Sequence, residues 1–234
     1  MKKTISVALG SVAAVMAVGV VAAAAGPILY RDIIADTAIT LPTVIPTMIE
    51  EPDASLANVD PLSGVWNISE GSYAGYRVNE VLNDGTKTPV TGRINQVRGT
   101  VTLTEETLTA ANVTVEVATI ATGNSLLDAY FRDTAMRVDN YPTAAFTITS
   151  PVALFPAPVA GEVQTRQATG DLTLHGITKT LQIKLQAQAS KTGVEITGSI
   201  PVSFSDYGVT APDLGFVSVQ DSGTIEFFLV VTKQ

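Results

Sequence analysis

Residues 168–187 read Ala168-Thr-Gly-Asp-Leu-Thr-Leu-His-Gly-Ile-Thr-Lys-Thr-Leu-Gln-Ile-Lys-Leu-Gln-Ala187, and this stretch decides the fold. In its first half, Leu172 and Leu174 alternate with polar residues, and the same period of two returns in its second half. His175 and Gly176 interrupt the alternation, and glycine adopts the backbone angles that tight turns need. The stretch therefore predicts two antiparallel β-strands joined by a tight turn, with one apolar face and one polar face.

Composition excludes several classes of function. The chain has 234 residues and a formal net charge of −8, so it is poorly suited to neutralising phosphates, and nucleic acid is not an expected partner. It contains no cysteine and one histidine, which excludes thiol chemistry and a histidine-rich metal centre. There is no phosphate-binding glycine loop and no nucleophile elbow. We therefore predict no catalytic residue, no metal site and no cofactor.

The N-terminal segment, residues 1–30, predicts a hydrophobic helix. Lys2 and Lys3 precede an apolar run that continues to about Tyr30, and roughly 20 helical residues cross a bilayer core. The length of the run favours an uncleaved membrane anchor, whereas the small residues 22–25 fit the cleavage site of a signal peptide. Either way, the two lysines place the N-terminus in the cytoplasm and the rest of the chain outside it.

Residues 31–60 predict an extended linker, because Pro42, Pro46 and Pro52 recur there and proline lacks a backbone donor and disfavours helix in the preceding residue. The folded domain is then expected over residues 61–234.

Within that domain, period-two patterns predict many strands of similar length. They include residues 163–174 and 180–188 around the central turn, and a final strand at residues 223–231. Residues 124–138 predict the one helix, capped by Thr122 or Asn124, with an Asp128–Arg132 ion pair on its solvated face. Many strands, short turns and one helix indicate an all-β fold, a closed antiparallel barrel of about eight strands.

The hairpin at residues 170–179 closely resembles the G-D-L-T-x-H-G-x-T-K motif of the YceI-like, polyisoprenoid-binding proteins. Further segments resemble motifs of that family in the same order: Gly64-Val-Trp66, Ser72-Tyr-Ala-Gly-Tyr-Arg-Val78, Thr122-Gly-Asn124 followed by Asp128, Tyr141-Pro-Thr-Ala-Ala-Phe146 and Ser205-Asp-Tyr-Gly208. The resemblance covers residues 61–234 and implies a lipocalin-like barrel with an elongated apolar cavity.

The resemblance also implies a function, the binding of a long-chain isoprenoid or similar amphiphilic lipid for transport or sequestration. The candidate cavity-wall residues are Tyr76, Val78, Glu80, Phe146, Leu172 and Leu174. Many relatives carry histidine near the position of Glu80, and an inward carboxylate there either meets the polar end of a ligand or reaches solvent at the end of its strand.

Two other functions compete with lipid binding. The barrel can instead be a membrane-anchored structural or protein-interaction module whose interior is filled by side chains. An enzyme would have to use His175, and we predict that the Asp171–His175 region forms a turn network instead. The domain is expected outside the cytoplasm, either anchored to the membrane or, after signal cleavage, secreted or periplasmic. The sequence leaves open whether the protein forms a homodimer.

Overall fold

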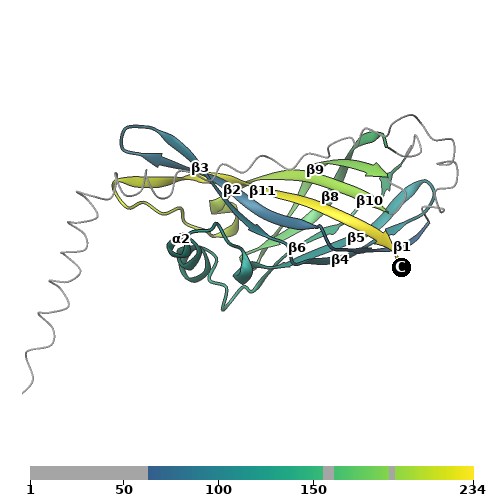
Figure 1. The fold of residues 1–234 in the computed structure, drawn as a ribbon, viewed down its shortest axis with the longest axis horizontal. Coiled ribbons are helices and arrows are strands. Elements are labelled where there is room, and N and C mark those ends of the chain that lie inside the picture. The colour runs from purple at the N-terminus through teal and green to yellow at the C-terminus, as the bar shows by residue number, and fades with distance from the viewer. Residues whose placement is uncertain (1–62, 155–160, 190–192) are drawn as a thin grey trace, which may run out of the picture.

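The computed structural model describes residues 63–154, 161–189 and 193–234, and β-strands dominate these ranges (Figure 1). The strands are β1 (Gly64–Ile68), β2 (Tyr73–Leu82), β3 (Lys87–Ile94), β4 (Val97–Leu103), β5 (Thr107–Glu116), β6 (Thr143–Ile148), β7 (Val152–Ala153), β8 (Val163–Leu174), β9 (Ile177–Ala189), β10 (Val194–Ser203) and β11 (Val217–Lys233). Between β5 and β6 the chain forms a short 3₁₀ turn (Val117–Thr119), the helix α2 (Ser125–Tyr130) and a π-helical turn (Phe131–Ala135).

The sheet closes into a barrel of eight antiparallel strands. β1 and β2 follow one another along the same neighbour, β11, and their other edges pair with β4 and β3. β1 and β2 therefore act together as one long, interrupted strand, and β3 and β4 act together as another. The remaining neighbours run in the order β4, β5, β6, β8, β9, β10, β11, which completes the ring. The predicted closed barrel of about eight strands with one short helix is confirmed.

Two serines between β1 and β2 bond to β11 where the first long strand is interrupted. The Ser69 amide donates to the Val230 carbonyl at 2.8 Å, and the Val230 amide donates to Ser72 Oγ at 2.9 Å. The backbone groups of β11 thus keep their partners while the first long strand bends.

The turn between β8 and β9 matches the prediction. Leu174 pairs with Ile177, which leaves His175 and Gly176 as a two-residue loop. Both have positive φ, +50° and +75°, as the tight turn that suits the twist of a hairpin requires. β8 spans Val163–Leu174 as predicted, and β9 extends the predicted strand at both ends.

The helix is shorter than predicted. Asn124 caps it, because its Oδ1 accepts from the amides of Leu126 and Leu127 at 3.0 and 3.3 Å. The expected ion pair between Asp128 and Arg132 does not form; Asp128 Oδ1 instead accepts from the amide and the hydroxyl of Thr122 at 2.8 and 2.7 Å. These bonds satisfy donors near the start of the helix, so Asp128 has a capping role that the sequence spacing alone does not reveal.

The final strand is longer than predicted. β11 begins at Val217 and ends at Lys233, and its N-terminal part pairs with β2 across an irregularity between Val219 and Gly223. In Figure 1 this part of β11 and the β2–β3 hairpin lie at the α2 end of the molecule, whereas β1 and the C-terminus lie at the other end.

The predicted N-terminal helix at residues 1–30 and the predicted linker at residues 31–60 lie outside the described residues. Within the described ranges, none of the helices has both the length and the apolar character that a membrane span requires.

Candidate ligand cavity

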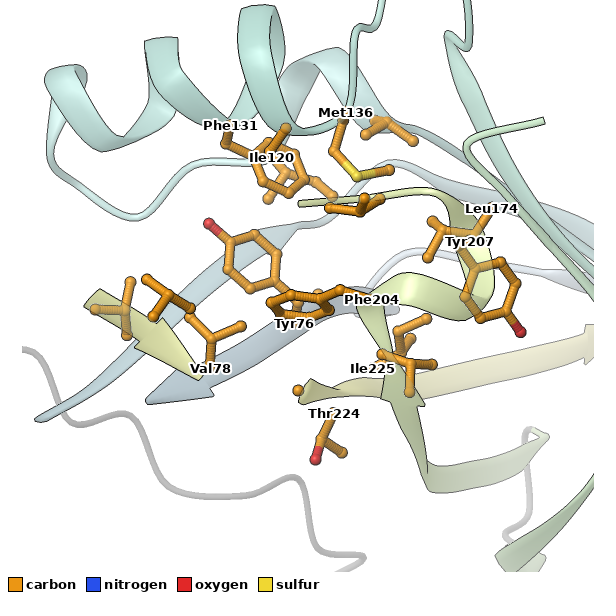
Figure 2. A pocket seen from close by; sticks show the side chains of 18 of the residues that line it. Tyr76, Val78, Ile120, Phe131, Met136, Leu174, Phe204, Tyr207, Thr224 and Ile225 are labelled. Carbon is orange, nitrogen blue, oxygen red and sulfur yellow. The ribbon is translucent and has the colours of Figure 1, made fainter. Parts of the chain in front are cut away.

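Inside the barrel, next to α2, lies a cavity with a volume of about 190 Å³. β2 contributes Tyr76 and Val78 to its wall, and β11 contributes Ile225. Figure 2 shows Phe131, Ile120 and Met136 above the cavity, with Tyr76 and Phe204 below them. The wall is therefore assembled from segments that lie far apart in the sequence, and almost all of it is hydrocarbon.

A second cavity, of about 110 Å³, lies among the middle strands of the barrel. Every side chain on its wall is apolar, including Phe146, Leu172 and Phe227. Four residues line both cavities: Ala74, Val115, Ala144 and Ile225. Because they share these residues, the two cavities are neighbours inside the barrel, and we refer to the two together as the hollow.

Glycines on neighbouring strands make room for the aromatic rings of this hollow. A Cβ atom on Gly92 would lie 2.4 Å from the Tyr76 ring, and one on Gly170 would lie 2.4 Å from the Phe146 ring. Any larger side chain at either glycine would push the ring toward the centre of the barrel. The glycines therefore let the rings lie against the wall, which leaves the hollow open.

The helical segment closes one side of the first cavity. Leu127, Phe131 and Ala135 recur at helical spacing, and all three line the wall. The Phe131 ring stacks on Tyr76 with 4.7 Å between ring centroids. Burial raises the pKa of the Tyr76 hydroxyl, and the negative charge of Asp128 raises it further, so Tyr76 stays protonated at neutral pH.

Within residues 63–154, 161–189 and 193–234, Glu80 is the one charged residue on the wall of either cavity. It is 5% exposed, and its Oε2 atom has no hydrogen-bond partner within the described ranges. Burial raises the pKa of its carboxyl to about 7, because the charged form loses its hydration.

All six residues predicted from the sequence line the hollow. Tyr76, Val78, Glu80 and Leu174 lie on the first cavity, and Phe146 and Leu172 on the second. Their position on the wall follows from the geometry, whereas their contact with a ligand stays a prediction. The prediction missed most of the other wall residues, among them Leu127, Phe131 and Ala135 of the helical segment. Their apolar spacing was visible in the sequence, but which way that face points depends on how the helix docks.

The residues around His175 form a turn network at the β8–β9 hairpin. Thr180 Oγ1 donates to Asp171 Oδ1 at 2.5 Å, and Thr173 and Thr178 share a hydroxyl hydrogen bond at 2.8 Å. The His175 ring bonds to the Tyr207 carbonyl through Nδ1 at 2.9 Å. His175 lines neither cavity, and no group of three metal-ligating side chains occurs in the part of the chain that the structure describes.

The family model of the YceI-like domain matches residues 66–231, nearly the whole barrel. The chain belongs to the YceI-like family. The resemblance of the hairpin and the other motifs to this family is thereby confirmed. No protein with a curated description matches the chain.

Solved structures agree on the YceI-like fold. A polyisoprenoid-binding domain from Saccharophagus degradans, implicated in plant cell wall breakdown, is 17% identical with a TM-score of 0.60, over 72% of this chain and 98% of that one. BcnA of Burkholderia cenocepacia is 21% identical with a TM-score of 0.53, over 67% and 96%. The YceI protein of Campylobacter jejuni is 16% identical with a TM-score of 0.50, over 62% and 85%. At these identities the likeness shows the fold alone.

Proposed function

We propose that this YceI-like barrel binds the apolar chain of a long isoprenoid or a similar amphiphilic lipid, as a carrier or sequestering protein. The observation that carries the proposal is the pair of neighbouring cavities, since the described residues that wall the second cavity are all apolar. The description of the Saccharophagus relative as polyisoprenoid-binding supports the same class of ligand.

The physical basis is the hydrophobic effect. Removing apolar surface from water is favourable by about 25 cal/mol per Å², so a chain of repeated hydrocarbon units gains affinity with each unit that enters the hollow. No reacting group is needed, and the wall residues have only to exclude water and match the shape of the chain. We accordingly propose a binding protein rather than an enzyme.

The first test is to find the cargo. The full chain is produced in a cell that makes isoprenoids, purified under mild conditions, and extracted for mass spectrometry. We expect a polyprenyl or quinone-like lipid in near-stoichiometric amount. An empty protein that also fails to bind added polyprenyl lipid would contradict the proposal and favour a structural module.

Variants locate the binding within the hollow. Phe146→Lys and Tyr76→Lys place a charge on the wall of each cavity, and burying an unpaired charge among apolar groups is costly. We expect each variant to lose the copurified lipid while circular dichroism still reports a barrel. Thr143→Lys is the matched control, because Thr143 is exposed on the same strand as Phe146. Retention of lipid in both cavity variants would show that the hollow is not the binding site.

We further propose that the domain works outside the cytoplasm, held at the membrane by residues 1–30 or released by cleavage. Lys2, Lys3 and the apolar run that follows support this location.

A further inference from the structure

The polar end of the hollow is set by Glu80, near the end of β2. Its neighbours across the sheet are Val219 on β11 and Thr88 on β3. The residue is 5% exposed and lines the first cavity, yet its Oε2 atom has no hydrogen-bond partner among the described residues. A buried carboxylate oxygen in native proteins normally has a partner, so Glu80 brings an unsatisfied carboxylate to the cavity wall.

A second buried carboxylate, that of Glu226, shows how the fold stabilises a buried acid with a partner from the protein itself. Glu226 is 3% exposed, and it lies beside Arg77 with the Arg77 Nε atom 2.8 Å from its Oε1 atom. The Arg77 Nη2 atom bonds to the other oxygen at 3.3 Å. Glu226 thus receives both a hydrogen-bond donor and a compensating charge, whereas Glu80 faces the cavity with neither from the described residues.

The walls also decide which ligand ends the hollow can accept. Among the residues that the structure describes, no lysine, arginine or histidine lines either cavity, and Glu80 supplies the only formal charge. A phosphate or diphosphate would therefore enter a low-dielectric space next to a carboxylate, without a cation to stabilise it. A hydroxyl or amine would instead give Glu80 the donor that it lacks.

We propose, building on lipid binding as the function, that Glu80 binds the polar end of the ligand and selects an end that donates a hydrogen bond. The preferred ligands are then prenyl alcohols, or lipids that end in an amine, and prenyl phosphates are rejected. The apolar second cavity takes the chain, so the ligand lies along the barrel with its polar end at Glu80.

The test is a competition between two probes that share one prenyl chain, geranylgeraniol and geranylgeranyl diphosphate. The full-length protein, in detergent at pH 8, is mixed with equal amounts of both, and native mass spectrometry measures the ratio of the two bound species. We expect the wild-type protein to carry the alcohol in excess. Glu80→Gln keeps the shape and an acceptor but removes the charge, so the alcohol-to-diphosphate ratio should fall by about tenfold, since one removed like-charge repulsion changes affinity on that scale.

Glu195→Gln is the matched control, because Glu195 lies on β10 and lines neither cavity. Its ratio should equal that of the wild type. Equal binding of both probes by the wild type, or a ratio that Glu80→Gln leaves unchanged, overturns this inference and leaves the proposed lipid binding intact. Failure of the wild type to bind either probe overturns lipid binding itself, and this inference with it.

Discussion

At the scale of single residues, two buried glutamates of the barrel differ in the partners that surround their carboxylates. Glu226 is paired with Arg77 and ties β11 to β2. Glu80 is almost as buried, but it lies on the cavity wall, where burial raises the pKa of its carboxyl to about 7. An unpaired buried acid reduces stability, and such a cost is typical of residues that serve a binding site.

The raised pKa predicts how stability depends on pH. The folded state binds the Glu80 proton more tightly than the unfolded state does, since the pKa rises from 4.5 to about 7. Its stabilising contribution is therefore complete below pH 4.5 and is lost as the pH rises through 7. We expect the ligand-free protein to lose on the order of 2–3 kcal/mol of unfolding free energy over this range through Glu80 alone.

Chemical denaturation of the wild type and of Glu80→Gln, each at pH 4.5 and pH 8, measures that contribution. The wild type should lose more stability than the variant between the two pH values, because glutamine does not titrate. Parallel losses in the two proteins would show that Glu80 is solvated in the folded state.

At the scale of elements, the β8–β9 hairpin shows how a turn fixes a register. The two-residue loop pairs Leu174 with Ile177, and this register turns Leu172 and Leu174 toward the hollow. A slip of one residue would turn the same side chains to the outer face. The hairpin therefore matters to the cavity as well as to the fold.

The turn can be tested at Gly176. Its φ is +75°, and a Cβ atom there would lie 2.5 Å from the Tyr141 ring, so Gly176→Ala should suffer from both strain and a clash. Gly85→Ala is the matched control, because Gly85 has φ +81° with no atom within 4 Å of the added Cβ. We expect Gly85→Ala to cost about 1 kcal/mol of unfolding free energy and Gly176→Ala roughly 1–3 kcal/mol more. Equal losses in a urea titration would mean that Tyr141 moves aside without cost.

At the scale of the whole molecule, closure of the barrel explains why the interior stays hollow. Eight strands enclose a space wide enough for one small ligand or for filling side chains. Here the inward side chains are small or aliphatic at many positions, such as Ala74, Ala111 and Ala144, and the rings lie over glycines. An apolar hollow in a closed sheet suits a ligand that must be kept from water.

The proposed location is also a property of the whole chain. If residues 1–30 direct the domain across the membrane, a protease added to intact spheroplasts should degrade the barrel, while a cytoplasmic marker protein survives. Replacing Lys2 and Lys3 by glutamate should reduce the exposed fraction, because the positive charges orient the segment. Protection of the wild-type domain from the protease would contradict the proposed location.

The sequence by itself determined most of the strands, the tight turn and the alternation of side chains between the two faces of each strand. These features are local, since a period of two and a glycine at a positive φ act through neighbouring residues. Alternation separates the two faces of each strand, and the resemblance to the YceI-like family indicated that Tyr76, Phe146 and Leu172 lie on the inward face, where the structure has them.

Only the tertiary structure decided the remaining features, because they depend on groups that are distant in the sequence. Helical spacing alone could not show that Phe131 stacks on Tyr76. Nor could it show that Asp128 accepts hydrogen bonds from Thr122 instead of pairing with Arg132. That the Glu80 Oε2 atom has no hydrogen-bond partner among the described residues can likewise be seen only when every neighbour of the carboxylate is known. Local propensity shapes the strands, whereas the closed barrel determines which polar groups meet a partner and which do not.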